Sequence, residues 1–288
     1  MSRISGFLGR TMLGLPIVVL MGVFFLVPMV IVASLAFRPY DAHSLIGTDF
    51  TLRNFARFLG DPTYLWAFAR TIAISAATTV LSVLLGYPVA LHLHRVKSGF
   101  ARLWLILIVL LPLMISLVVA SFAWLLLLGN NGTINAGLIQ LGLISQPIAL
   151  MNTITGVIIV GTFGSLSYPI LTIFAALENI PPDLSRSARI HGASDGQVFT
   201  RILFPLSLPG VVSGALIVFA LNMAAFVIPF LIGGGRVHVV PLLIYQFTLQ
   251  LFDWPGAATL GILLFTLTLA CTWAIGSFCQ RLMPWEKP

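Results

Sequence analysis

The sequence predicts an all-α polytopic membrane protein with six transmembrane helices and both termini on the cytoplasmic side. Hydrophobic residues make up 59% of the 288 residues, charged residues make up only 8%, and the mean hydropathy is +1.05. Soluble domains carry about three times that share of charged residues. Apolar runs of at least about 20 residues, the length that crosses a bilayer, recur along the chain. The length suits a single membrane domain over residues 1–288.

The first two runs differ in how they begin. The first follows a short basic N-terminal stretch, and its apolar core is longer than that of a signal peptide, so we expect an uncleaved span. The second follows a polar, charged segment over residues 38–65. A short basic segment over residues 94–102 separates it from the third. The six predicted spans cover residues 11–37, 68–92, 103–128, 153–177, 205–232 and 257–278.

The later runs are separated by stretches of different character. Residues 129–151 contain no charge but many Asn, Gly and Gln residues, which predicts a loop with a short interfacial helix. Residues 181–210 are polar and charged, and residues 233–255 contain three consecutive glycines and are expected to form a loop.

The distribution of basic residues predicts the orientation. Ten of the 15 Lys and Arg residues lie on the predicted face that carries the termini, and five lie on the other. By the positive-inside rule, the first face is cytoplasmic. The ten are Arg3, Arg10, Arg95, Lys97, Arg102, Arg186, Arg189, Arg201, Arg281 and Lys287. The net charge of +7 is explained in this way, so no nucleic-acid partner is expected.

The sequence lacks the residue patterns expected for ion coupling, ATP binding, metal binding and catalysis. The predicted spans carry no acidic or basic residue away from their ends, which argues against an ion-coupled carrier. Neither lysine, Lys97 or Lys287, follows the glycine spacing of a phosphate-binding loop, so any ATP must be bound by another chain. The histidines lack acidic or Cys partners in sequence, and no metal site, cofactor or catalytic set is expected.

The polar segment between the fourth and fifth spans has local signals for two short helices around a glycine. Pro181 and Pro182 suit a first helical turn. Gly192 suits the left-handed residue that ends this helix. Ser194 and Gln197 have the spacing of a capping box, which begins a second helix. An ordinary loop is the other interpretation of the same residues.

This segment resembles the cytoplasmic coupling loop of ABC importer permeases, whose motif is E-A-A, three residues, Gly and, about nine residues later, I-x-x-P. Arg186, Ser187 and Ala188 stand at E-A-A, Gly192 stands at the glycine, and residues 202–205 form the ending. Arg186 replaces the acid of the motif, and Ser187 replaces its first alanine. The residues that the resemblance assigns to coupling with an ATPase, over about 179–204, are Asp183, Arg186, Ser187, Ala188, Arg189, Gly192, Ala193, Ser194, Phe199 and Pro205.

Four further stretches resemble spermidine/putrescine-type permeases: residues 50–55, 86–90, 226–235 and 253–258. The resemblance implies a type I ABC importer permease fold in a bacterial inner membrane. It also implies two ATPase subunits that bind ATP and Mg²⁺, a second permease that is related but distinct, and a solute-binding protein on the outer face. The chain itself would not be an enzyme. Its solute would be a polyamine or a similar small organic solute.

A few polar residues inside the later spans have two interpretations. Such residues can hydrogen-bond to a neighbouring helix or back to the backbone of their own helix, or they can line a solute path. Tyr168 and Asn222 are our candidates for the path; the others are Thr162, Ser165, Ser167 and Ser213. We expect Gly161, Gly164, Gly210 and Gly214 to permit close helix packing.

Three alternatives stay open. An ion-coupled secondary transporter would continue to transport after ATP depletion and stop when the ion gradient is lost. An ABC permease for a different solute would keep the mechanism but not the polyamine. A membrane scaffold protein would show no solute flux.

Overall fold

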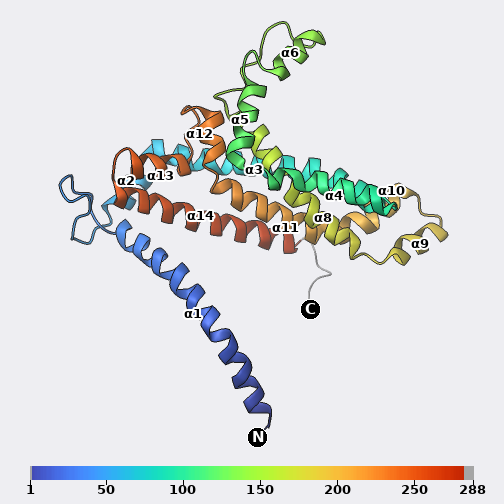
Figure 1. The fold of residues 1–288 in the computed structure, drawn as a ribbon, viewed down its shortest axis with the longest axis horizontal. Helices are drawn as coiled ribbons and strands as arrows, with labels where there is room; N and C mark the ends of the chain where they lie inside the picture. The colour runs from blue at the N-terminus through green and yellow to red at the C-terminus, as the bar shows by residue number, and fades with distance from the viewer. Residues whose placement is uncertain (1, 282–288) are drawn as a thin grey trace. The chain divides into compact units, whose positions relative to one another are not determined.

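The computed structural model describes the backbone of residues 2–281 and the side chains of residues 19–279 and 281. Three of the basic residues behind the predicted orientation, Arg3, Arg10 and Lys287, therefore have side chains outside the described residues. All the regular secondary structure of the described residues is helical, and loops join the helices (Figure 1). Its contacts divide it into two compact units, Met1–Leu65 with Leu243–Phe265 and Trp66–Leu242 with Thr266–Pro288.

The helices confirm the predicted fold class. Among the described residues, five helices are long and apolar enough to cross a membrane, and the count is six when the bent pair α7 and α8 is taken as one span. The elements are α1 (Ser2–Ala36), α2 (Arg53–Gly60), α3 (Pro62–Arg95), α4 (Gly99–Met114), α5 (Leu117–Leu128), α6 (Thr133–Gln140), α7 (Ile154–Ser165), α8 (Ser167–Glu178), α9 (Pro182–Ile190), α10 (Asp195–Val198), the π-helical turn η1 (Phe199–Leu203), α11 (Phe204–Met223), α12 (Val227–Gly233), α13 (Val240–Leu249) and α14 (Trp254–Arg281).

The second span begins earlier than predicted. Asp61 precedes α3, and its Oδ1 accepts a hydrogen bond of 2.8 Å from the backbone N–H of Thr63. This bond lowers the pKa of the Asp61 carboxyl because it stabilises the charged form. Pro62 then occupies the first helical position, where its missing N–H is not needed. These two residues extend the helix beyond the purely apolar run.

The prediction of a continuous third span is wrong. The run over residues 103–128 is divided into α4 and α5, and Ile115 and Ser116 between them are extended, with ψ angles of 133° and 130°. Pro112 lies inside α4, where it removes one helical hydrogen bond and crowds the preceding turn. Ser116 is a single uncharged polar residue in a long apolar run, so the mean hydropathy of the run did not reveal the break.

The fourth and fifth spans also differ from the prediction. Helices α7 and α8 are bent by 42° relative to one another. Helix α11 ends at Met223, well before the predicted residue 232, and the remaining apolar residues form the separate helix α12. The predicted loop over residues 233–255 contains α13, which has Pro241 in its first turn. The predicted short helix in residues 129–151 is α6, and the sixth predicted span lies within α14.

Helices α8 and α11 pack closely within the second unit (Figure 1). A Cβ at Gly210 would lie 2.6 Å from the Thr172 carbonyl oxygen, and a Cβ at Gly214 would lie 2.8 Å from Pro169 Cα. The prediction of close packing is confirmed at these two glycines. Gly164 is different, since the nearest contact of its Cβ would be an ordinary 3.7 Å. The buried core around α8 consists of Ala90, Val109, Ile170, Ile173, Leu177, Ile180, Val198 and Leu203.

The first unit is held together by polar contacts at helix ends. Asn54 Nδ2 donates to the carbonyl oxygens of Ala36 and Arg38, at 3.2 and 2.8 Å. Arg57 forms an ion pair of 3.1 Å with the buried Asp253, whose other oxygen accepts the backbone N–H of Gly256 at the start of α14. These bonds satisfy backbone groups that helix ends leave without intrahelical partners.

Candidate functional site

Residues 179–204, called the coupling segment here after the family motif that they resemble, have the local structure predicted from their sequence. Helix α9 has Pro181 at its N-cap and Pro182 as its first residue. Gly192 follows α9 with a φ of +86°, in the left-handed region. Ser194 Oγ accepts the N–H of Gln197 at 3.3 Å, and Gln197 Oε1 accepts the N–H of Ser194 at 2.9 Å. The predicted helix, glycine turn and capping box are all confirmed.

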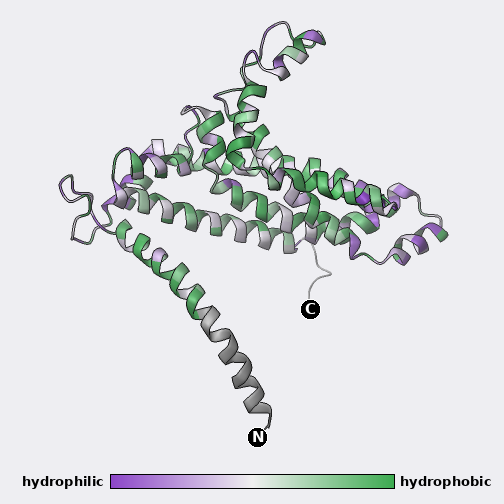
Figure 2. Ribbon diagram, in the orientation of Figure 1, coloured by the Kyte–Doolittle hydropathy of each residue, from purple (hydrophilic) through white to green (hydrophobic). Residues whose placement is uncertain are grey.

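The surface of the coupling segment is almost entirely exposed. No residue of α9 is buried, and Ile190 at its end is 83% exposed. Arg186 pairs with Asp183 at 3.3 Å, and Arg189 pairs with Asp195 at 3.0 Å. Exposed ion pairs contribute little to stability. Figure 2 shows the hydrophilic residues of α9 and α10 beside the apolar helices of the same unit.

Three of the residues that the resemblance assigns to coupling, Ala188, Gly192 and Ala193, line a hollow beside the glycine turn. The hollow has a volume of about 460 Å³. A cavity of this size can take side chains of a partner protein, as the anchor pockets of protein interfaces do. Its lining residues are Ala188, His191, Gly192, Ala193, Gln197, Arg201 and Ile202. Phe199 lies in η1, and Pro205 is the second residue of α11.

Glu178, directly before the coupling segment, attaches it to two neighbouring helices. In the sequence, Glu178 is simply the first residue after the fourth predicted span. Its carboxylate accepts hydrogen bonds from His94 Nδ1 at 2.8 Å and from Arg102 at 2.5 Å. The guanidinium of Arg102 also lies over the Phe174 ring, 4.9 Å from its centroid. These contacts join the end of α8 to the end of α3 and the start of α4. No sequence pattern links residues so far apart in the chain.

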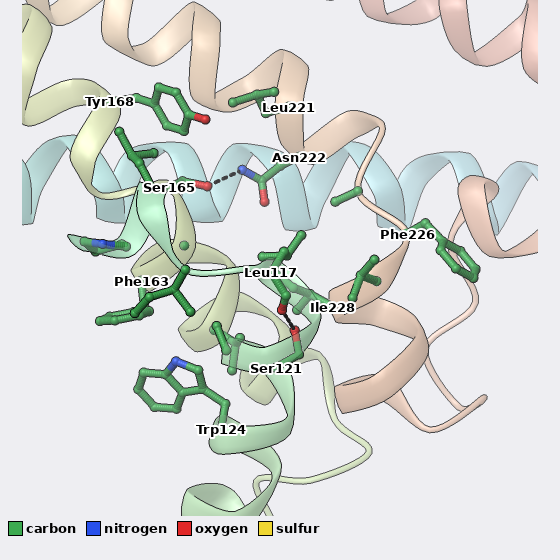
Figure 3. A pocket seen from close by; sticks show the side chains of 18 of the residues that line it. Leu117, Ser121, Trp124, Phe163, Ser165, Tyr168, Leu221, Asn222, Phe226 and Ile228 are labelled. Carbon is green, nitrogen blue, oxygen red and sulfur yellow. Dashed lines mark hydrogen bonds between the residues drawn. The ribbon is translucent and has the colours of Figure 1, made fainter. Parts of the chain in front are cut away.

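Tyr168 and Asn222, the two candidates for a solute path, both line one cavity of about 510 Å³ (Figure 3). Asn222 Nδ2 donates to Ser165 Oγ at 2.9 Å and to the carbonyl oxygen of Val218. The rest of the wall is mostly aliphatic, and Trp124, Phe163 and Phe226 add aromatic rings to it. Trp124 and Phe163 are in edge contact, at 5.2 Å between ring centroids. Among the described residues that line this cavity, none is charged.

Three helix breaks meet at this cavity, and sequence analysis predicted none of them. The α4–α5 break contributes Ile115, the α7–α8 bend contributes Ser165, and the α11–α12 break contributes Ala224 to its lining. Irregular backbone at membrane depth is tolerated where it is buried in protein or lines a cavity. Several carbonyl oxygens near these breaks already accept hydrogen bonds, that of Leu111 from the Ile115 N–H, that of Phe163 from the Leu166 N–H and that of Asn222 from the Ala225 N–H.

The other polar residues of the later spans have mixed roles. Ser167 Oγ donates to the carbonyl oxygen of Val109 at 2.6 Å, and Ser213 Oγ donates to that of Pro209 at 2.8 Å. Both therefore follow the packing interpretation rather than the path interpretation. Among the described residues, no three His, Cys, Asp or Glu side chains gather into a metal site.

An exposed polar segment between membrane helices, together with a cavity at their breaks, is the arrangement of a membrane transport subunit that works with a partner protein. The chain belongs to the family of binding-protein-dependent transport system inner membrane components, whose model matches residues 79–283. It is a multi-pass inner-membrane permease subunit of an ABC importer, which confirms the resemblance seen in the coupling segment.

Three known proteins show how far the similarity extends. The spermidine/putrescine transport system permease protein PotB of Haemophilus influenzae is 30% identical over 239 residues, 83% of each chain. The molybdenum transport system permease protein ModB of Mycobacterium bovis is 32% identical over 225 residues, 78% of this chain and 83% of that one. A chain in the crystal structure of a bacterial alginate ABC transporter, in complex with an alginate pentasaccharide-bound periplasmic protein, superimposes with a TM-score of 0.78 at 21% identity and covers 96% and 95% of the two chains.

Proposed function

We propose that this permease carries polyamines such as spermidine or putrescine into the cell. It would act with a second, distinct permease subunit, two ATPase subunits that bind ATP and Mg²⁺, and a solute-binding protein on the outer face. The coupling segment would dock on one ATPase subunit, in the cytoplasm where ATP is available. The chain would hydrolyse no ATP itself.

The main structural support for a polyamine solute is the chemistry of the residues that line the cavity. Ammonium groups are attracted to the faces of aromatic rings, and Trp124, Phe163 and Tyr168 present such rings to the cavity. The side-chain amide oxygen of Asn222 supplies a hydrogen-bond acceptor. The cavity lining contains no Lys, Arg or His, the side chains that favour anionic solutes, and no Asp or Glu either, so recognition of a cation there would rest on the aromatic rings. The similarity to PotB supports the same solute class.

The coupling segment supports the ATP-driven mechanism over an ion-coupled one. Its exposed helix, hollow and ordered glycine turn form a surface for a protein partner. In the described part of the chain, the apolar stretches over residues 19–36, 71–91, 117–140, 154–177, 202–223 and 254–279 contain no Asp, Glu, Lys or Arg, so they offer no charged side chain for ion coupling. ATP-driven closure of the two ATPase subunits would move the coupling segments together and open the path outward.

The test is transport by the reconstituted complex. The chain would be co-purified with the ATPase and permease encoded beside it, placed in liposomes, and supplied with the neighbouring solute-binding protein. We expect uptake of labelled spermidine or putrescine that requires ATP and loaded binding protein. Stimulation by molybdate or an acidic oligosaccharide instead would discard the polyamine. Transport that persists without ATP and stops when the ion gradient is collapsed would discard the mechanism.

A further inference from the structure

The turn that joins the coupling segment to α11 is wider than an α-helix. Residues Phe199–Leu203 form a π-helical turn, in which the Phe204 N–H donates to the Phe199 carbonyl oxygen five residues before it. Pro205 explains this widening. It has no N–H, and in an α-helix its ring would press against the carbonyl of Arg201 four residues earlier. A π-turn relieves this clash, and such turns often lie at functional sites.

Three aromatic rings form a cluster at the π-turn. Tyr87 of α3 lies 5.8 Å from Phe199 and 5.7 Å from Phe204 between ring centroids, and the two phenylalanines are 6.1 Å apart. Tyr87 Oη is also 2.8 Å from Ser207 Oγ, which is completely buried in the first turns of α11. Tyr87 therefore contacts the turn on its coupling-segment side through Phe199 and on its α11 side through Phe204 and Ser207.

Helix α11 connects this turn to the cavity. It runs without a break from Phe204 to Met223, and Asn222 in its last turn reaches both Ser165 and the cavity. Gly210 and Gly214 hold its middle in close contact with α8. Although Pro209 lies inside α11, the helix stays continuous, so a displacement that reaches its start can pass along it to Asn222.

Tyr87 stands on a firmly held part of α3. A Cβ added to the adjacent Gly86 would lie 3.3 Å from side-chain atoms of both Pro169 and Ile170 on α8, so the two helices are already in close contact there. The Tyr87 ring is consequently a fixed support beside a turn that can widen or narrow.

We propose that Tyr87 is a positioning residue that supports the π-turn, so that movement of the coupling segment displaces α11 instead of being absorbed by the turn. This inference rests on the proposed docking of the coupling segment on an ATPase. Without the Tyr87 ring, the turn would bend when the ATPase moves. ATP would still be hydrolysed, but the cavity would not respond.

The experiment compares solute carried per ATP hydrolysed in reconstituted complexes. Tyr87→Leu removes the ring, while Tyr87→Phe keeps the ring and removes only the hydrogen bond to Ser207. Tyr64→Leu is the matched control, since Tyr64 belongs to another three-ring cluster, 4.8 Å from Phe58 and 6.2 Å from Phe247. We expect Tyr87→Leu to retain assembly and ATP hydrolysis but to lower the transport ratio about fivefold or more. Tyr87→Phe should lower it less, and Tyr64→Leu should leave it unchanged.

Two results would overturn the inference. One is a Tyr87→Leu complex with the wild-type ratio of transport to hydrolysis. The other is a Tyr87→Leu chain that fails to assemble while Tyr87→Phe keeps the wild-type ratio, which would make the ring a packing element only. Failure of the unmodified chain to bind any ATPase would instead contradict the proposed function, and this is established before the variants are compared.

Discussion

Asn222 Nδ2 lies 2.9 Å from Ser165 Oγ, and this hydrogen bond joins the last turn of α11 to the last residue of α7. The two residues are 57 positions apart in the chain. Both line the cavity, and each lies beside a helix break. The bond therefore connects the helix that leaves the coupling segment with the bend at which the fourth span changes direction.

Replacement of Asn222 by Ala tests the role of this amide. Loss of one neutral hydrogen bond costs about 1 kcal/mol, which corresponds to about a fivefold change in an equilibrium constant. We expect the concentration of solute-loaded binding protein that gives half-maximal uptake to rise about fivefold, while the complex still assembles. Ser213→Ala is the control on the same helix, because the Ser213 hydroxyl donates to the backbone carbonyl of Pro209, one turn earlier in α11. Equal effects of the two substitutions would remove Asn222 from the path.

Tyr168 tests the recognition of a cation by aromatic rings. Its ring lines the cavity, so Tyr168→Phe keeps the aromatic face and Tyr168→Leu removes it. A cation over a ring contributes about 0.5–2 kcal/mol. We expect the Leu variant to lose spermidine uptake severalfold and the Phe variant to stay near the wild type. The readout is initial uptake at several solute concentrations. Identical behaviour of the Leu variant and the wild type would count against cation recognition at this ring.

Gly192 tests the coupling segment. The φ of +86° costs a residue with a side chain roughly 1–2 kcal/mol, and an aspartate there would also add a negative charge beside the hollow. We expect Gly192→Asp to insert into the membrane but to lose ATP-dependent uptake. Gly99→Asp is the matched control, because Gly99 is exposed at the start of α4, outside the coupling segment, and a Cβ there meets nothing within 4 Å. Normal uptake by Gly192→Asp would contradict the role assigned to the turn.

Gly214 tests the contact between α8 and α11. A side chain at this position would force the helices apart, since its Cβ would lie 2.5 Å from Thr172 Oγ1 and 2.8 Å from Pro169 Cα. Overpacking of this kind costs about 1–3 kcal/mol. We expect Gly214→Val to lower the thermal stability of the purified protein in detergent. Gly261→Val in α14 should have a small effect, because a Cβ at Gly261 meets nothing within 4 Å. Equal stabilities of the two variants would show that α8 and α11 separate without cost.

Much of the coupling segment could be predicted because its signals are local. Two consecutive prolines predict a helix start, and one glycine predicts a left-handed turn. Ser194 and Gln197, three residues apart, predict a capping box, and all three signals act among residues that are close in sequence. Each was found as predicted. The attachment by Glu178 was not predicted, because His94 and Arg102 come from other helices.

The chain's composition and the order of its apolar runs determined by themselves that this is an all-α membrane protein with as many as six spans. Only the tertiary structure decided where those spans break, and it brought three breaks to one cavity with Tyr168 and Asn222. The physical reason is that a break in an apolar helix exposes backbone groups which must find polar partners or line a cavity. The polar side chains near the breaks find their partners far away in the chain, as Asn222 does in Ser165. Isolated serines at the breaks, such as Ser116 and Ser165, are too few to interrupt an apolar run in the sequence.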